Sequence, residues 1–434
     1  MENYSKKHFC YLPFEGFTVD PRGKAIPCPA WTDNPDMMFA DLRTGNETIN
    51  DIFHGKKMSS MRKMMSRDQK VEACSVCYRK ESKGLLSQRI KVARRKRVQK
   101  QLQTLFEDVD NKFLKVEHKP KIKSLELNFS NQCNLACAMC NHTHSSGWLK
   151  QEQTMPTHIR KLRDAYPGFL AGVPFEQYIL KRNFVDSIID NIEGLEQIMI
   201  KGGEPLYDKN CLYLLEALTK VKPDIKIIIV SNITHVPQRT LDIFAKLQNL
   251  NINASIDGVG KTYEWVRGFD FAKINENYQM LSQLPNIKRL DVNMCTSIYN
   301  IHNVMDTINH FLKYFKLNYK KSDGTLDKKY SFAFGFAGEP WSDQGILLDE
   351  DKQDILKTFK RDITKLVDQH IFNEQQLQDA MRLQFAPSHM MLGNKELDKW
   401  RKMFYDYVVW MNTVRGFDLR SISKPVDNLM RMYD

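Results

Sequence analysis

The sequence predicts an α/β fold: a partial (β/α)6 TIM-like barrel, preceded by a small β-hairpin and helix module and followed by a helix-rich extension. Three observations lead to this prediction. The chain has 434 residues, 42% of them hydrophobic, which is enough for two or three globular domains. Strand-like and helix-like segments alternate through its middle part, as in parallel sheets with right-handed crossovers. A turn-rich segment near the N-terminus separates two short strand-like runs.

The barrel is predicted from six strand patterns and the helical patterns between them. The strands are expected at residues 124–130, 196–201, 226–231, 250–256, 288–296 and 330–337. The helices are expected at residues 182–193, 208–221, 238–247, 271–284 and 301–316. Six units make an open barrel, whose sites should lie at the carboxyl ends of the strands. We therefore divide the chain into a module at 1–90, a basic helical linker at 91–121, the barrel at 122–340 and a helical extension at 341–434.

The N-terminal module carries a cysteine pattern typical of a metal site. The turn Asp-Pro-Arg-Gly at residues 20–23 indicates a β-hairpin. One cysteine precedes this hairpin, one ends it, and a Cys-x-x-Cys pair follows a helical stretch at residues 49–65. The four residues are Cys10, Cys28, Cys74 and Cys77. A zinc ribbon is one interpretation of such a four-thiolate set.

A second cysteine group follows the first predicted barrel strand. Cys133, Cys137 and Cys140 lie within eight residues. Three thiolates in so short a loop can surround one cubic iron–sulfur cluster and leave its fourth iron without a protein ligand. Zinc is the alternative, because Cys-x-x-Cys is a common zinc spacing.

The sequence Cys-Asn-Leu-x-Cys-x-Met-Cys at 133–140 resembles the radical S-adenosylmethionine (SAM) enzymes. The resemblance implies that Cys133, Cys137 and Cys140 are catalytic and hold a 4Fe–4S cluster whose open iron binds SAM. An electron from that cluster would split SAM into methionine and a 5′-deoxyadenosyl radical. A flavodoxin or ferredoxin-type reductant is expected as partner.

The strand ends carry further motifs that resemble those of this family. Gly-Gly-Glu-Pro after the second strand matches the motif for the SAM amino group, a Ser-Asn pair ends the third strand, and a Ser-x-Asp-Gly…Arg pattern follows the fourth. The implied SAM contacts are Gly202, Gly203, Glu204, Pro205, Ser231, Asn232, Ser255, Arg267 and Asn293.

Each of these residues also has an ordinary structural interpretation. Asn232 is equally typical of a loop cap, and Arg267 of a surface ion pair. Alternation places Cys295 on the same face as Asn293, where it is typical of a small buried residue. His142 and His144 follow the cysteine loop; a catalytic role is one interpretation, and a helix-start or packing role is the expectation for both.

The N-terminal pattern is similar to the twitch or SPASM module of radical SAM enzymes. The similarity extends from the hairpin cysteines to Cys74-x-x-Cys77-Tyr78-x-x-Glu81-x-x-Gly84-x-x-Ser87-x-Arg89. It implies that Cys10, Cys28, Cys74 and Cys77 hold a second, auxiliary 4Fe–4S cluster. In the family this module usually follows the barrel, whereas here it comes first.

Composition and charge restrict where the protein works and what it binds. No apolar run approaches the roughly 18 residues of a membrane span, and the N-terminus lacks the apolar core of a signal peptide. A cytoplasmic location with free cysteines is therefore expected. The formal charge is +12, and residues 79–123 contain 15 Lys or Arg against 5 Asp or Glu. That segment is either the solvated face of a linker helix or a nucleic-acid contact.

The resemblance implies an enzyme that removes a hydrogen atom from its substrate, a peptide or protein side chain in our interpretation. The first alternative is the same chemistry on a nucleotide, sugar or nucleic acid. The second is a non-catalytic iron–sulfur or zinc protein that binds nucleic acid. The sequence leaves open whether the substrate is a peptide or a small molecule.

Overall fold

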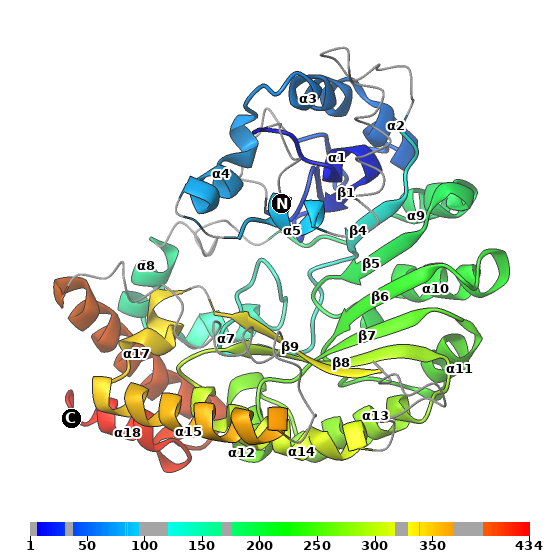
Figure 1. Cartoon of the computed structure of the whole chain (residues 1–434). Coiled ribbons are helices and arrows are strands. Elements are labelled where there is room, and N and C mark those ends of the chain that lie inside the picture. The colour runs from blue at the N-terminus through cyan, green and yellow to red at the C-terminus, as the bar shows by residue number, and fades with distance from the viewer. Residues whose placement is uncertain are drawn as a thin grey trace. The chain divides into compact units, whose positions relative to one another are not determined.

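The computed structural model describes residues 7–30, 38–82, 84, 86–94, 120–165, 176–316, 329–337, 339–368 and 394–434. The chain divides into two compact units (Figure 1). The first unit combines Met1–Ser130 with Tyr178–Ile228, and the second combines Asn131–Gln177 with Ile229–Asp434. Each unit is described by itself. Residues 95–119, which include most of the densest basic run at 91–100, lie outside the described residues.

The first unit is built on five strands in the order β3-β2-β1-β4-β5. Their bounds are β1 (Gly16–Val19), β2 (Lys24–Ile26), β3 (Ala40–Asp41), β4 (Ser124–Asn128) and β5 (Gln197–Lys201). The predicted hairpin is confirmed: β1 and β2 are antiparallel. The Asp20 carboxylate closes its turn by accepting the backbone N–H groups of Arg22 and Lys24, at 2.8 and 2.9 Å.

The N-terminal hairpin continues the barrel sheet within this unit. β1 runs parallel to β4, which in turn runs parallel to β5. The Asn128 side chain donates to the Val19 carbonyl at 2.7 Å and adds a link between β4 and β1. The close approach requires glycine at position 16, because a Cβ there would lie 1.7 Å from the Ser124 carbonyl oxygen.

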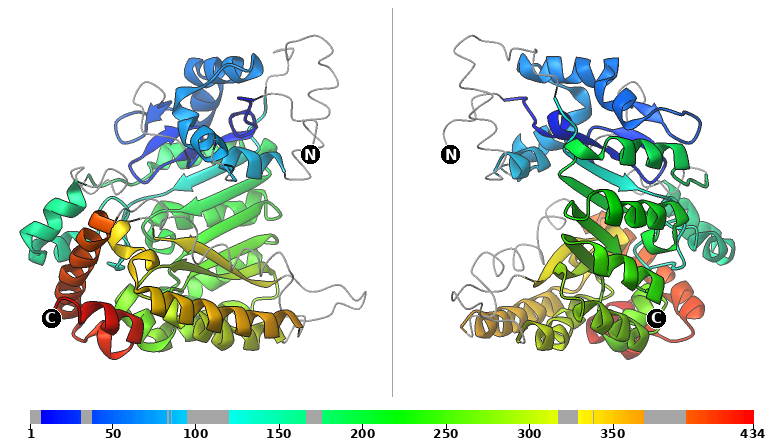
Figure 2. Two further views of the ribbon diagram at one scale, coloured as in Figure 1. Left: turned by 60° about the vertical axis from the view of Figure 1, so that its left-hand side comes forward. Right: turned by 90° about the vertical axis from the view of Figure 1, so that its right-hand side faces the viewer.

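Short helices complete the first unit. They are α1 (Leu12–Glu15), α2 (Ile49–His54), α3 (Lys56–Ser66), α4 (Ser75–Ser82), α5 (Gln88–Ala93), α9 (Arg182–Asp190) and α10 (Lys209–Val221). The helix expected at residues 49–65 is divided into α2 and α3, because Gly55 has extended backbone between them. In Figure 2, α9 and α10 lie side by side. Strand β6 (Lys226–Ser231) contains the boundary between the units.

The second unit contains the remaining barrel elements and the C-terminal helices. Its parallel strands are β7 (Leu250–Ser255), β8 (Ile287–Thr296) and β9 (Tyr330–Phe336). Its helices are α7 (Trp148–Thr154), α8 (Thr157–Asp164), α11 (Gln238–Lys246), α12 (Gly260–Arg267), α13 (Phe271–Ser282), α14 (Val304–Lys316), α15 (Asp349–Asp368), α17 (Asn394–Arg415) and α18 (Lys424–Met430).

The mixed α/β class with a mostly parallel sheet is as predicted, and it is consistent with a partial TIM-like barrel behind a small N-terminal module. All six expected barrel strands are present as β4 to β9, within a few residues of the predicted ends. Among the helices of the described residues, none is both long and apolar enough to cross a membrane.

Candidate functional site

The three cysteines at 133, 137 and 140 lie in an irregular loop of the second unit. The loop is folded onto the segment that follows it: the Ser146 hydroxyl accepts the Cys133 N–H at 3.2 Å, and the Ser145 hydroxyl donates to the Leu135 carbonyl at 2.5 Å. Burial raises the pKa of Cys137 and Cys140, and the pKa of Cys140 is raised further by its two partner thiols. The three sulfur atoms are therefore close enough to interact.

Two polar side chains reach these sulfur atoms. The Arg267 guanidinium, at the end of α12, donates to Cys137 Sγ at 3.6 Å and lowers the pKa of that thiol. The Asn232 amide donates to Cys133 Sγ at 3.8 Å. Both are residues that the sequence assigned to SAM, and the structure brings both to the cysteine loop.

Arg267 is held by a buried carboxylate rather than by a surface partner. Its Nε lies 2.5 Å from Asp257 Oδ2, and the Asp257 side chain is 0% exposed. The other carboxylate oxygen accepts the Cys295 N–H at 2.6 Å. The surface ion-pair interpretation of Arg267 was therefore wrong about its exposure. Asp257 was missed, although its Ser-x-Asp-Gly context was the available signal.

The turn after β6 is strained and tightly hydrogen-bonded. Ile233 has a φ of +50°, which is costly for a β-branched residue. The Ser231 hydroxyl accepts the Ile233 N–H at 2.9 Å, and the side-chain Oδ1 of Asn232 accepts the Thr234 N–H at 2.9 Å. Asn277 donates to the Ile233 carbonyl at 2.7 Å. Asn232 thus caps this loop, as the structural alternative expected, and its amide still points to Cys133.

The remaining predicted contacts divide between the two units. In the second unit, Ser255 ends β7 and pairs in register with Asn293 on β8. Asn293 and Cys295 are both half-buried while Met294 between them is buried, so the predicted shared face is confirmed. His142 contacts the Glu152 carboxylate at 2.8 Å, which supports a packing role, and His144 is exposed.

The Gly-Gly-Glu-Pro motif belongs to the first unit, directly after β5. Gly202 has a φ of +147°, and a Cβ there would lie 2.7 Å from the Ser130 carbonyl oxygen. Gly203 donates its N–H to that same oxygen at 2.7 Å. Glu204 is buried, and its carboxylate accepts the Leu206 N–H at 3.1 Å. Pro205 begins a short 3-10 turn.

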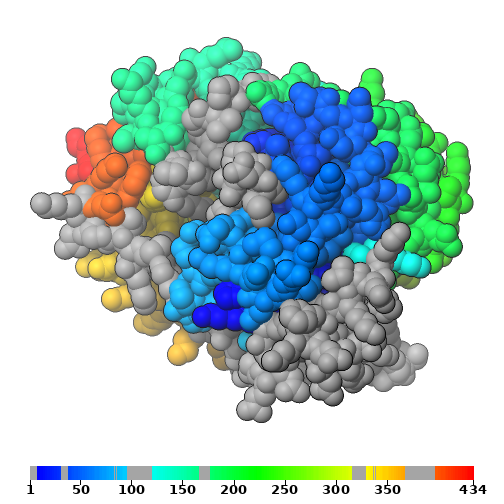
Figure 3. Space-filling view, turned by 90° about the horizontal axis from the view of Figure 1, so that it is seen from above, coloured from blue at the N-terminus to red at the C-terminus, as the bar shows by residue number. Residues whose placement is uncertain are grey.

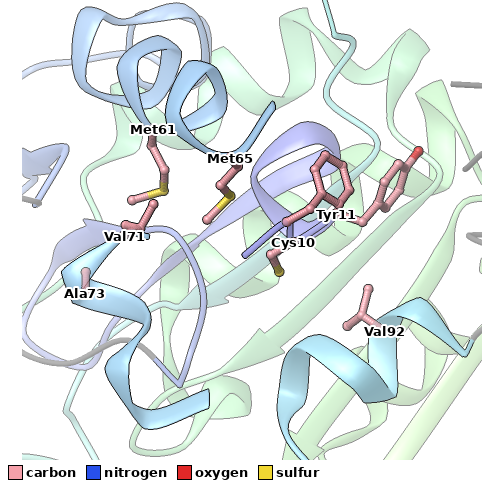
Figure 4. Packing of buried hydrophobic residues seen from close by; sticks show 8 residues of the cluster. Cys10, Tyr11, Met61, Met65, Val71, Ala73 and Val92 are labelled. Carbon is pink, nitrogen blue, oxygen red and sulfur yellow. The ribbon is translucent and has the colours of Figure 1, made fainter. Parts of the chain in front are cut away.

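The other four predicted ligands gather in the N-terminal part of the first unit. Burial raises the pKa of Cys10 and Cys74 to about 12, and in Cys10 the Cys74 and Cys77 thiols raise it as well. Burial also raises the pKa of Cys28, and the charge of Cys10 raises it further. All four thiols therefore interact, and each is a free cysteine. In Figure 4, Cys10 lies among Met65, Val71 and their apolar neighbours.

A charged group supports this thiol set from the following helix. Arg89 of α5 lowers the pKa of Cys10 and Cys74, donates to the Phe9 carbonyl at 3.1 Å and pairs with Glu81. The Ser87 hydroxyl donates to the same carboxylate at 2.5 Å. The motif residues after Cys77 therefore place a guanidinium beside the thiols.

Comparisons with known families agree with both cysteine groups. The model of the radical SAM superfamily matches residues 127–311, and the model of an iron-sulfur cluster-binding domain, SPASM, matches residues 10–78. Residues 127–311 thus belong to the radical SAM superfamily, and residues 10–78 to the SPASM domain family. The SPASM domain precedes the radical SAM domain in the sequence.

The chain is also similar to solved structures. Streptococcus suis SuiB bound to precursor peptide SuiA is 13% identical, with 71% of this chain and 62% of SuiB covered and a TM-score of 0.38. The same SuiB bound to S-adenosylmethionine is 14% identical, with 63% and 65% covered and a TM-score of 0.34. Native anSMEcpe with bound AdoMet is 15% identical, with 57% and 62% covered and a TM-score of 0.37. The chain thus spans less than two thirds of the length of these proteins. No curated protein matches the sequence.

Membership implies a 4Fe–4S cluster with SAM and an auxiliary iron–sulfur cluster, and the thiols fit both groups. A buried thiolate is unstable without a positive partner, and iron supplies that charge. Burial raises the pKa of Cys10, Cys28, Cys74, Cys137 and Cys140, and the thiols within each set interact electrostatically. Among the described residues, no group of three or more His, Cys, Asp or Glu side chains is arranged to hold a single metal ion.

Proposed function

We propose that Cys133, Cys137 and Cys140 are the protein ligands of the SAM-cleaving cluster. The observation that carries the proposal is the presence of two separate sets of interacting thiols, one of three and one of four, in a chain matched by both family models. A 4Fe–4S cluster with SAM bound supplies the reductive cleavage that yields the 5′-deoxyadenosyl radical. A set of three thiols is suited to this task because it leaves one iron for SAM.

The chain's own residues bind and orient the cofactors. Arg267 is a fixed positive charge beside Cys137, kept in place by Asp257, and a guanidinium is suited to an anionic carboxylate group. Asn232 offers an amide near Cys133, at a turn with a strained backbone. The proposed SAM contacts are Gly202, Gly203, Glu204, Pro205, Ser231, Asn232, Ser255, Arg267 and Asn293.

The four thiols of Cys10, Cys28, Cys74 and Cys77 hold an auxiliary 4Fe–4S cluster in this proposal. Four protein thiolates complete all positions of such a cluster, so it has no position for SAM. Its role is to accept or relay an electron, or to hold the substrate. A flavodoxin or ferredoxin-type protein is the proposed reductant.

A peptide or protein side chain is the proposed substrate. Its support is the half-exposed face of β4 and β5, where Lys201 Nζ lies 2.5 Å from Glu126 Oε1 and Met199 is next to them. A face with both charges and an apolar side chain is suited to peptide groups, whereas polyphosphate or nucleic acid favours an excess of positive charge. The nucleic-acid alternative depends on residues 79–123, most of which lie outside the described residues.

Anaerobic SAM cleavage tests the cluster assignment. The reconstituted and reduced chain should form 5′-deoxyadenosine, slowly even without substrate, and the triple variant Cys133→Ala/Cys137→Ala/Cys140→Ala should form none. The matched control is Cys211→Ala, which removes a buried thiol that belongs to neither set. Cleavage that persists in the triple variant would refute the assignment.

A second assay tests the substrate class. Size-fractionated peptides and small molecules from an anaerobic lysate are added separately, and 5′-deoxyadenosine release is measured together with the mass change of each fraction. We expect acceleration and a mass change in a peptide fraction. Acceleration by the nucleotide fraction alone would replace the peptide proposal with the nucleotide one.

A further inference from the structure

The C-terminal helix α17 donates hydrogen bonds into the cysteine loop of the same unit. The Tyr407 hydroxyl donates to the Ala138 carbonyl at 2.5 Å, and the Arg415 guanidinium donates to the Ala136 carbonyl at 2.6 Å. These two carbonyls stand on either side of Cys137. Tyr407 is buried, so its hydrogen bond is shielded from water.

Aromatic residues tie the same loop to its neighbours. The Trp148 indole donates to the Cys137 carbonyl at 3.2 Å, and its ring lies 6.2 Å from that of Trp410 on α17. In Figure 3, α17, in orange, lies against the teal residues of α7 and α8, and α17 contacts α8. The helix therefore holds the loop directly and also supports a second donor to it.

A third link connects α17 to α12, the helix that ends in Arg267. Arg415 Nε donates to the Trp265 carbonyl at 2.6 Å, and the Trp265 indole donates to Asn412 at 2.8 Å. The loop itself donates from the Ala138 N–H to the Val266 carbonyl at 2.7 Å. Arg415 therefore bridges the cysteine loop and the helix that positions the Cys137 partner.

We propose that Tyr407 and Arg415 are positioning residues for the SAM-cleaving cluster, and that α17 sets the place and the electrostatic surroundings of Cys137. The inference rests on the proposed function, because it takes Cys137 as a cluster ligand. A buried carbonyl that loses its donor moves toward another partner, so losing either bond should displace the segment that carries the thiol. The Arg415 charge also acts near the cluster, where a positive charge favours the reduced form.

Matched variants on the same helix test the proposal in the reconstituted full chain. Tyr407→Phe removes only the hydroxyl, and its control is Tyr405→Phe, whose hydroxyl bonds to Asp434 at 3.3 Å. Arg415→Gln is compared with Arg401→Gln, because Arg401 also donates to two backbone carbonyls, those of Ile346 and Leu347, at 2.7 and 3.2 Å. Arg415→Lys keeps the charge and one donor.

Two readouts separate positioning from general stability. Anaerobic hydrogen–deuterium exchange should be about five-fold faster in a peptide covering 133–140 for Tyr407→Phe and Arg415→Gln. This factor corresponds to the stabilising free energy lost with one hydrogen bond. A peptide covering 74–93 serves as internal reference and should be unchanged. In a redox titration followed by EPR, Arg415→Gln should shift the midpoint potential of the SAM-binding cluster to a more negative value. In Arg415→Lys the midpoint potential should return most of the way to that of the unaltered chain.

Unchanged exchange at 133–140 in Tyr407→Phe and Arg415→Gln would overturn the proposal. Equal acceleration in Arg401→Gln or Tyr405→Phe would also overturn it, because the effect would then be one of helix stability alone. The failure of this proposal can be told apart from the failure of the proposed function. Hydrogen–deuterium exchange reports on the cysteine loop, whereas SAM cleavage by the triple cysteine variant tests the cluster ligands.

Discussion

The two thiol sites of this protein differ in what surrounds their sulfur atoms. In the N-terminal site, Cys10 packs among Met61, Met65 and Val71, the Tyr78 hydroxyl bonds to Cys74, and the buried Arg89 guanidinium supports the thiols through its charge. In the barrel site, a guanidinium and an amide donate to the sulfur atoms: Arg267 to Cys137 and Asn232 to Cys133.

This difference matches the number of thiols in each site. A site whose four positions are all filled by protein needs only burial and a compensating charge. A site that must also accept SAM needs polar groups that orient a charged ligand beside the metal. Under the proposed function, the N-terminal site holds the auxiliary cluster and the barrel site the reactive one, and the following variants test that difference.

The largest effect is expected from removing the auxiliary ligands. Cys74→Ala/Cys77→Ala should lose about four iron atoms per chain and lose substrate modification, yet keep slow, substrate-independent formation of 5′-deoxyadenosine. Iron analysis, EPR and product chromatography measure the three quantities. If this variant loses SAM cleavage while it retains the iron at Cys133, Cys137 and Cys140, the two sites do not function independently. Zinc in place of iron after anaerobic reconstitution would support the ribbon interpretation.

The charged partners of the two sites should differ in their importance for stability. Arg267→Gln leaves the Asp257 carboxylate, 0% exposed, without its counter-ion, which should cost about 3–5 kcal/mol. Arg89→Gln should cost about 2 kcal/mol, because Glu81 keeps the Ser87 hydroxyl as a donor. Denaturant unfolding of the reconstituted chains measures both, and Lys261→Gln, at an exposed ion pair, is the control. An equal loss of stability in Arg267→Gln and Arg89→Gln would contradict the expected difference between the two sites.

The glycine motif of the first unit should be sensitive to a single methyl group. Gly202→Ala combines a φ of +147° with a clash against the Ser130 carbonyl, and we expect a loss of about 2–3 kcal/mol. Gly84→Ala is the matched control: its φ is +70°, but among the described residues nothing lies within 4 Å of an added Cβ, so the loss should be about 1 kcal/mol. Thermal unfolding gives the comparison, and an equal loss at both positions would show that the Ser130 contact is unimportant. Gly202→Ala should also raise the KM for SAM.

The smallest effect is a pH dependence located in the second unit. Burial lowers the pKa of His302 to about 4. Above pH 6.5 the imidazole is neutral in both the folded and the unfolded chain, whereas below it the unfolded chain takes up a proton that the folded chain refuses. The free energy of unfolding should therefore decrease as the pH is lowered, by about 1.4 kcal/mol from pH 7.5 to pH 5.5. His302→Gln should lack this part of the pH dependence in anaerobic unfolding curves, and identical curves for both chains would refute the assignment.

Much of the fold was predictable because its signals are local. The strand patterns that became β4 to β9, the hairpin of β1 and β2, and the cysteine triplet at 133–140 are visible within windows of a few residues. The prediction erred where a local pattern was interrupted or a partner was distant. The helix expected at 49–65 is broken at Gly55, and Arg267 pairs with a buried carboxylate ten positions earlier rather than with solvent-exposed charge.

The sequence by itself determined the triplet at 133–140 and the Cys-x-x-Cys pair at 74–77, because their spacing is a short-range property. It also determined the order of helices and strands, since periodicity reports the buried face of each element. Only the tertiary structure decided that β1 joins β4 as a parallel neighbour and that Tyr407 and Arg415 hold the carbonyls beside Cys137. Those contacts join residues about one hundred to almost three hundred positions apart, and a hydrogen bond to a backbone carbonyl leaves no mark in the sequence of its acceptor.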